Sequence, residues 1–211
     1  MNDKYTRIVK HYEDCLDKHG DTHLGVDWPK LEDVDKRYRV MMDLLRFDSQ
    51  LQQPASLLDF GCGAAHLIEY IRKNDMEQVH YSGLDLSQKF ISLCQQKYPE
   101  QSFYCLDILQ NADQLPVFDY VVMNGVFTEK RDLTQDEMWE YLQKMLLAIV
   151  PHTRRGIAFN VMSKNVEWER DDLFHLSHDL LTDFVTKKIS RDYIVRADYQ
   201  LYEYTTYIYK R

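Results

Sequence analysis

Two glycines between an apolar run and a helical pattern constrain the fold of this chain most strongly. Residues 57–60 are mostly apolar, which is typical of a strand that is covered on both faces. Gly61 and Gly63 come directly afterwards and allow backbone angles and close approaches that a side chain would prevent. Residues 64–71 then repeat apolar side chains at helical spacing. A strand, a glycine turn and a helix form the cofactor-binding corner of a doubly wound α/β fold.

A second apolar run, at residues 79–84, ends at Asp85. An acidic residue at the tip of the second strand, roughly 20 residues after the glycine turn, is placed to bind the hydroxyl pair of a ribose. The glycine turn and Asp85 together predict a cofactor that contains a nucleoside.

The residues around the glycines distinguish two kinds of cofactor. A dinucleotide site favours a small residue at position 66, where this chain has His66, and it does not require the acid Asp59. Asp59-Phe60-Gly61-Cys62-Gly63 instead resembles motif I of the class I S-adenosylmethionine (SAM)-dependent methyltransferases. This resemblance implies SAM as the cofactor and S-adenosylhomocysteine (SAH) as the product.

The resemblance also implies which residues bind SAM. In the family the glycine turn lies against the methionine part, and an acid after the third strand accepts a hydrogen bond from the adenine amino group. Asp107 and Ile108 match that position, although Asp107 also suits a turn or a helix cap. The residues expected at the cofactor are Asp59, Gly61, Cys62, Gly63, Asp85, Leu86, Asp107, Ile108 and Asn124.

The motif IV region argues against nucleic acid as the substrate. Methyltransferases that act on bases or on a glutamine amide typically carry two prolines here, whereas this chain has Gly125 and Val126 between Asn124 and Phe127. The formal net charge of −8 also disfavours a broad phosphate-binding surface.

Candidate catalytic residues follow from the need to take a proton from the acceptor. His175 is the first candidate base, because imidazole titrates near neutral pH, and Glu129 is a second group that could orient the acceptor. His178 and Asp172 compete with them, and a lone histidine beside an apolar helix is often only a structural hydrogen-bonding group. The four cysteines stand singly, so we expect no metal site.

The order of the patterns predicts one domain over residues 1–211. We expect a Rossmann-like α/β core over residues 55–211, with a mostly parallel seven-stranded sheet, helices on both faces and an antiparallel last strand. Residues 1–48 should form a helical cap, which either closes over the cofactor or simply covers the sheet. Arg37 and Arg46 are possible partners of the SAM carboxylate.

Several segments, including Asp27-Trp28-Pro29 and residues 124–130 and 168–176, resemble small bacterial methyltransferases of surface-polysaccharide synthesis. This resemblance implies O-methylation of a small molecule or glycan precursor, at a sugar or a sugar-linked group. The alternatives are a catalytically inactive SAM-binding module, a partner-dependent subunit, an NAD-linked oxidoreductase and an aminopropyltransferase.

The remaining expectations concern the location and assembly of the protein. The charged first twenty residues do not suit a signal peptide, and no apolar run reaches the roughly 18 residues of a membrane helix. Single cysteines suit a reducing compartment, so we expect a cytoplasmic protein without membrane insertion. Both a monomer and a homodimer are compatible with the sequence.

Overall fold

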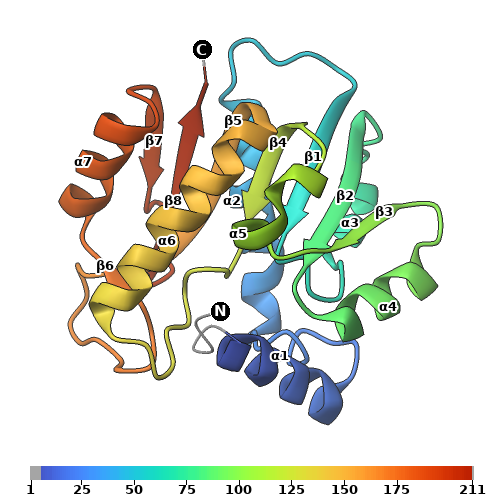
Figure 1. Cartoon of the computed structure of the whole chain (residues 1–211), viewed down its shortest axis with the longest axis horizontal. Helices are drawn as coiled ribbons and strands as arrows, with labels where there is room; N and C mark the ends of the chain where they lie inside the picture. The colour runs from blue at the N-terminus through green and yellow to red at the C-terminus, as the bar shows by residue number, and fades with distance from the viewer. Residues whose placement is uncertain (1–5, 211) are drawn as a thin grey trace.

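The structure is a computed structural model that describes residues 6–210. Its centre is an eight-stranded sheet in which most neighbouring strands run parallel (Figure 1). The strands are β1 (Ala55–Phe60), β2 (Val79–Asp85), β3 (Ser102–Cys105), β4 (Phe118–Met123), β5 (Thr153–Ser163), β6 (His175–Leu176), β7 (Tyr193–Arg196) and β8 (Glu203–Tyr209). The α-helices are α1 (Thr6–His19), α2 (Val34–Arg46), α3 (Leu67–Lys73), α4 (Gln88–Lys97), α5 (Ile108–Asn111), α6 (Gln135–Ile149) and α7 (His178–Lys188).

The strand order is β3-β2-β1-β4-β5-β8-β7, and the short β6 pairs with β5. Strand β8 runs antiparallel to both of its neighbours, β5 and β7. The chain moves outward from β1 to β3 and then crosses back to β4, so the direction of strand addition reverses between β1 and β4. A ligand of an open α/β sheet binds outside the carboxyl ends of the strands at such a switch point. This architecture confirms the predicted Rossmann-like fold with its antiparallel last strand.

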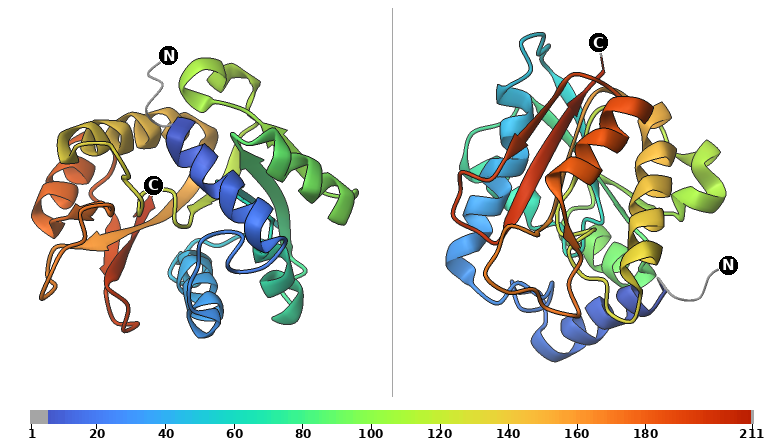
Figure 2. Two further views of the ribbon diagram at one scale, coloured as in Figure 1. Left: turned by 90° about the horizontal axis from the view of Figure 1, so that it is seen from below. Right: turned by 90° about the vertical axis from the view of Figure 1, so that its left-hand side faces the viewer.

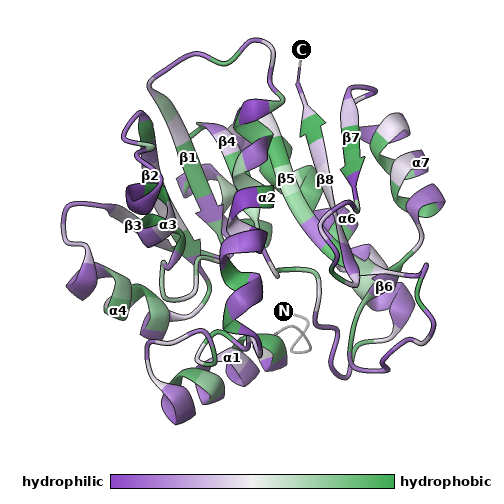
Figure 3. Ribbon diagram, turned by 180° about the vertical axis from the view of Figure 1, so that it is seen from behind, coloured by the Kyte–Doolittle hydropathy of each residue, from purple (hydrophilic) through white to green (hydrophobic). Residues whose placement is uncertain are grey.

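The apolar strands form because both faces of the sheet are covered. Leu57 and Leu58 are both fully buried, and because side chains alternate along a strand they belong to two separate cores. One core contains residues of α5, α6 and α7, whereas the other contains residues of α2, α3 and α4. Figure 3 shows hydrophobic residues in β1 and in the middle of β5, with hydrophilic residues on the exposed turns of the helices. Continuous apolar runs are therefore required in the central strands.

The predicted N-terminal cap divides into two parts with different positions. Helix α2 packs against the sheet, where the Tyr209 hydroxyl donates a hydrogen bond of 2.8 Å to the Leu44 carbonyl. Helix α1 instead lies across the carboxyl ends of the parallel strands (Figure 2). The two interpretations of residues 1–48 thus each describe one helix: α2 covers the sheet, and α1 covers the expected ligand position.

Local sequence signals set several helix boundaries. Ser87 caps α4 by accepting a hydrogen bond from the Phe90 amide, and Thr134 and Glu137 form a reciprocal capping box at the start of α6. Among the described residues, no helix is long and apolar enough to cross a membrane.

Candidate active site

The glycine turn lies directly under a cavity at the switch point. Gly61 and Gly63 have φ angles of +73° and +50°, in the left-handed region that favours glycine. The amides of Gly61 and Cys62 both donate to the Leu84 carbonyl, at 2.7 and 3.0 Å, which ties the turn to the end of β2. A Cβ atom on Gly61 would lie 2.8 Å from the Val126 side chain. The turn therefore depends on glycine for both its conformation and its close packing.

Asp85 lines this cavity at the tip of β2, where the sequence predicted it. One carboxylate oxygen accepts a 3.0 Å hydrogen bond from the Gly63 amide, and the other accepts a 2.9 Å hydrogen bond from the Ser87 amide. Burial raises the pKa of Asp85 above its usual value, and these backbone donors oppose that increase. Each carboxylate oxygen has a further lone pair, so the group can still accept hydrogen bonds from a ribose. Leu86 lines the cavity beside it.

Asp59 lies at the base of the cavity and is almost completely buried. Its carboxylate accepts a 2.9 Å hydrogen bond from the Tyr81 hydroxyl. Burial raises the pKa of Asp59 to about 7, and the nearby charge of Asp85 acts in the same direction. Asp59 can therefore change its charge near neutral pH, directly below the cofactor position.

The opposite wall of the cavity comes from the N-terminal segment. Helix α1 contributes Ile8, Val9 and Tyr12, and the loop that follows it contributes Val26 and Trp28. A second contact closes the same side, because the Ser87 hydroxyl donates a hydrogen bond to Glu13 of α1. The cavity thus lies between the sheet edge and the N-terminal segment, which shields this side of a bound ligand from solvent.

Asn124 lines the cavity at the end of β4 with an unusual lack of hydrogen bonds. Its amide oxygen and amide nitrogen are both buried, and neither has a hydrogen-bond partner within the described part of the chain. The following residue, Gly125, has a φ angle of +80° and donates a 2.8 Å hydrogen bond to the Asn160 side chain. A buried amide without hydrogen-bond partners lowers the stability of the folded protein. This position therefore fits a ligand that supplies a donor and an acceptor.

Asp107 and Ile108 occupy a different position from the other expected cofactor residues. Neither is among the residues 6–210 that line the cavity. The Asp107 carboxylate caps α5 by accepting a 3.0 Å hydrogen bond from the Leu109 amide, and Ile108 is buried. The cap role that the sequence left open is therefore present, and adenine binding by Asp107 and Ile108 remains a prediction.

Glu129 lies beyond β4, outside the set of described residues that line the cavity, within a group of charged residues from three segments. Its side chain is 13% exposed and lies 3.4 Å from Arg131. Burial and the neighbouring carboxylates of Asp27 and Asp172 raise the pKa of Glu129, whereas Arg131 lowers it. A carboxylate with a raised pKa, close to the motif IV loop, is suited to hold and release a proton.

His175 lies outside the set of described residues that line the cavity. It is 3% exposed, its Nδ1 is 2.6 Å from the Ser163 carbonyl, and its Nε2 accepts a 3.3 Å hydrogen bond from the Arg170 amide. Both ring nitrogens are therefore engaged by backbone groups, which leaves neither of them directed at the cavity. These contacts favour the structural alternative for His175 over the catalytic one.

The two arginines considered for the SAM carboxylate are engaged elsewhere. Arg37 donates to Glu203, with its Nε at 3.2 and 3.3 Å from the two carboxylate oxygens. Arg46 is 75% exposed and lies 3.8 Å from Asp43. In the described residues neither arginine lines the cavity.

The structure brings together residues that the sequence analysis did not connect. His66 lines the cavity and contacts Asp21 at 2.6 Å, and Lys97 contacts the same aspartate at 2.7 Å. Helix α1 places His11 and Cys15 one turn apart, and the loop brings Asp27 to them. The spacing of four residues between His11 and Cys15 was the only available signal, and it becomes informative only with the distant Asp27.

Comparisons with known proteins agree with this arrangement. Residues 58–151 match the sequence model of a methyltransferase domain. A curated Mycobacterium tuberculosis protein named as a methyltransferase, Rv1506c, is 25% identical over 162 residues, which cover 74% of this chain and 94% of that protein.

Two solved structures share the fold at low identity. The magnesium protoporphyrin IX methyltransferase from Synechocystis PCC 6803, with bound SAM, has a TM-score of 0.65 at 16% identity and covers 100% of this chain and 98% of its own. The plantazolicin methyltransferase BpumL, in complex with a substrate analogue and SAH, has a TM-score of 0.63 at 14% identity and covers 98% of this chain and 91% of its own. The matching methyltransferase domain, the curated relative and the shared fold, combined with the cavity above the glycine turn, support a SAM-dependent methyltransferase.

Proposed function

We propose that this enzyme methylates a hydroxyl group of a small molecule or glycan precursor, at a sugar or a sugar-linked group. The observation that carries the proposal is the buried side-chain amide of Asn124, which lines the cavity and has no partner among the described residues. A hydroxyl group both donates and accepts a hydrogen bond, so it can satisfy this amide. The resemblance of several segments to methyltransferases of surface-polysaccharide synthesis supports the same acceptor class.

The chain's own residues would act mainly by positioning the reactants. SAM, when bound, supplies a methyl group on a sulfonium, so the electrophile is already activated. Gly61, Gly63 and Asp85 would hold the cofactor, and α1 would shield it from water. Asn124, which the sequence analysis expected at the cofactor, would instead orient the acceptor oxygen from the end of β4. Glu129 would accept the hydroxyl proton, because its raised pKa brings it closer to neutral pH.

The acceptors of the structural relatives differ from the proposed one. Their names specify magnesium protoporphyrin IX and plantazolicin, so the shared fold does not define the acceptor. Asp27, Glu129 and Arg131 form a charged group close to the motif IV loop, and such a group would suit an acceptor rich in hydroxyl groups better than an apolar ring system.

The test is SAH formation by the purified chain with SAM and a panel of sugar nucleotides and free sugars. We expect SAH and a singly methylated sugar to appear together, and Asn124→Leu to abolish both products while SAH binding by calorimetry is retained. Matched reactions with porphyrin and peptide acceptors serve as controls. SAH binding without turnover on any sugar would instead support the inactive module or the partner-dependent subunit.

A further inference from the structure

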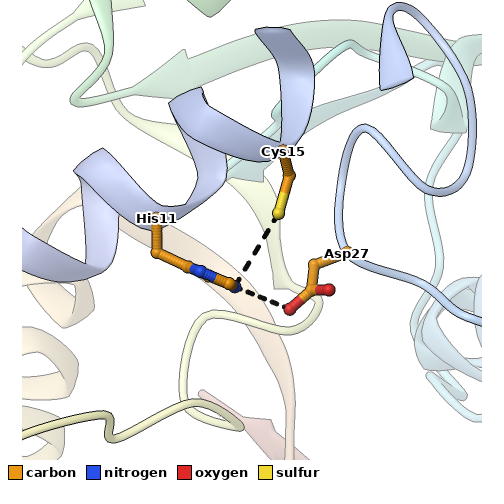
Figure 4. A group of neighbouring side chains, drawn as sticks. All are labelled: His11, Cys15 and Asp27. Atoms are coloured by element: carbon orange, nitrogen blue, oxygen red, sulfur yellow. Dashed lines mark hydrogen bonds and ion pairs between the residues drawn. The ribbon is translucent and has the colours of Figure 1, made fainter. Parts of the chain in front are cut away.

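A histidine, a cysteine and an aspartate come together beside the cavity and belong to none of the interactions described above. His11 and Cys15 lie on one face of α1, and Asp27 reaches them from the following loop (Figure 4). The His11 Nε2 atom is 2.7 Å from an Asp27 oxygen and 3.9 Å from the Cys15 sulfur. All three potential ligand atoms lie within 4.8 Å of one another.

These separations are close to those around a tetrahedral zinc ion. With the usual Zn–N, Zn–O and Zn–S bond lengths, neighbouring nitrogen and oxygen ligands lie about 3.3 Å apart, and nitrogen and sulfur ligands about 3.6 Å apart. The observed nitrogen–oxygen distance of 2.7 Å is about 0.6 Å shorter than the expected one, and the observed nitrogen–sulfur distance of 3.9 Å is about 0.3 Å longer. Small side-chain rotations would therefore suffice to admit the ion.

The loop that supplies Asp27 is held in place on both sides. The Asp27 amide donates a 3.1 Å hydrogen bond to the Leu24 carbonyl, and the Trp28 amide donates a 2.8 Å hydrogen bond to the His23 carbonyl. Asp21, earlier in the loop, is bound by Lys97 and His66 of the core. The aspartate is thus positioned before any ion binds, which reduces the ordering cost of binding.

The charges around the three ligands are mixed. Asp27 and the largely buried Glu129 repel each other across this region, and Asp14 lies on the same helix as the two α1 ligands, whereas Arg131 and Lys18 bring positive charge nearby. A divalent cation would offset this repulsion. A simple His11–Asp27 ion pair would account for two of the three side chains, but it leaves the adjacent thiol unexplained.

We propose that His11, Cys15 and Asp27 bind a zinc ion with an open fourth position at the rim of the cofactor cavity. The mixed nitrogen, sulfur and oxygen set suits zinc, and three protein ligands are typical of zinc sites that keep a position for another ligand. Tyr12 and Trp28, which adjoin the ligands in the chain, line the cavity. A hydroxyl of the acceptor is the natural fourth ligand, and this last step alone rests on the proposed function.

The test is a titration of the metal-free, untagged chain with Co²⁺, which replaces zinc and reports a thiolate ligand through a charge-transfer band in the near ultraviolet. We expect one Co²⁺ per chain with that band, displaced by Zn²⁺. Cys15→Ser should remove the band, and Asp27→Asn should weaken binding at least about tenfold. Cys105→Ser, which changes an exposed cysteine away from the three ligands, should leave both readouts unchanged.

A second measurement needs no variant. Zinc should protect Cys15 of the unaltered protein from alkylation, while the exposed Cys105 reacts at the same rate with and without zinc. Absence of the thiolate band, or alkylation of Cys15 that zinc does not slow, would overturn the site. Both experiments omit SAM and acceptor, so their outcome is separate from that of the methyl-transfer assay.

Discussion

At the scale of single residues, Asp59 makes the stability of the fold depend on pH. The folded protein holds its proton with a pKa of about 7, compared with an ordinary value of 3.8, because the carboxylate is buried. Between pH 3.8 and about pH 7, Asp59 has lost its proton in the unfolded chain but keeps it in the folded protein. The free energy of unfolding therefore falls as pH rises through this window. Across the whole window the free energy of unfolding decreases by about 4 kcal/mol.

We expect Asp59→Asn to remove that pH dependence, because asparagine does not ionise and can still accept from Tyr81. Urea unfolding of both proteins at pH 5 and pH 8 measures it. The variant should gain stability relative to the parent at pH 8, with a smaller difference at pH 5. Parallel stability curves for the two proteins would show that Asp59 does not titrate in this range.

Asp85 should contribute directly to cofactor affinity. Asp85→Ala should weaken SAM binding by about 1–3 kcal/mol, since charge-assisted hydrogen bonds to the ribose are lost. Titration calorimetry measures this change. Asp85→Asn is the matched control for the turn, because its amide oxygen can still accept from the Gly63 or the Ser87 amide. Equal SAM affinity in the alanine variant and the parent would remove Asp85 from the site.

His175 and Glu129 should respond differently to substitution. His175→Ala should lower the free energy of unfolding by about 1–3 kcal/mol, because buried backbone groups lose their partners, and turnover per folded molecule should persist. Glu129→Gln should lower turnover by roughly 10²–10⁴ if it is the general base, with SAM binding unchanged. A loss of that size for His175→Ala, without loss of stability, would restore the catalytic assignment of the histidine.

At the scale of secondary-structure elements, Arg37 of α2 and Glu203 of β8 form a pair that fixes the helix to the sheet. The Glu203 side chain is 3% exposed, and Arg37 contacts both of its carboxylate oxygens. The sequence suggested a cofactor role for Arg37, but this long-range contact could not be read from residues 166 positions apart. Its tertiary partner determines the role of the arginine.

We expect Arg37→Met to destabilise the protein by about 3–5 kcal/mol, because it leaves a buried carboxylate without a counter-charge. The double variant with Glu203→Gln should recover most of this loss. Urea unfolding of the two single variants and the double variant forms the cycle, and SAH calorimetry tests the cofactor role separately. Additive effects of the two substitutions would contradict a coupled pair.

At the scale of the whole molecule, cofactor binding should stabilise the complete fold. SAH contacts would join α1, the glycine turn and β2, so thermal unfolding should shift upward by several degrees when SAH is present at 100 times its dissociation constant, which adds about 2.7 kcal/mol. NAD at the same concentration is the control and should produce no shift. A shift with NAD alone would contradict the cofactor assignment.

Much of the architecture could be predicted because its signals are local. The apolar runs of β1, β2, β4 and β8 and the capping box of α6 are visible in short windows. Strand β6 and helix α5 were not predicted, because two and four residues are too short to show a period. The apolar face of α1 could be predicted from the spacing of its residues, but the cavity that this helix covers could not.

The sequence by itself determined the α/β fold, the glycine turn and the position of Asp85 at the tip of a strand, because each depends on residues close together in the chain. Only the tertiary structure decided that His175 is bound by backbone groups, that Arg37 meets Glu203, and that Asp27 lies beside His11 and Cys15. These three outcomes depend on contacts between distant segments, and the packing of the sheet, rather than any local pattern, places those segments together.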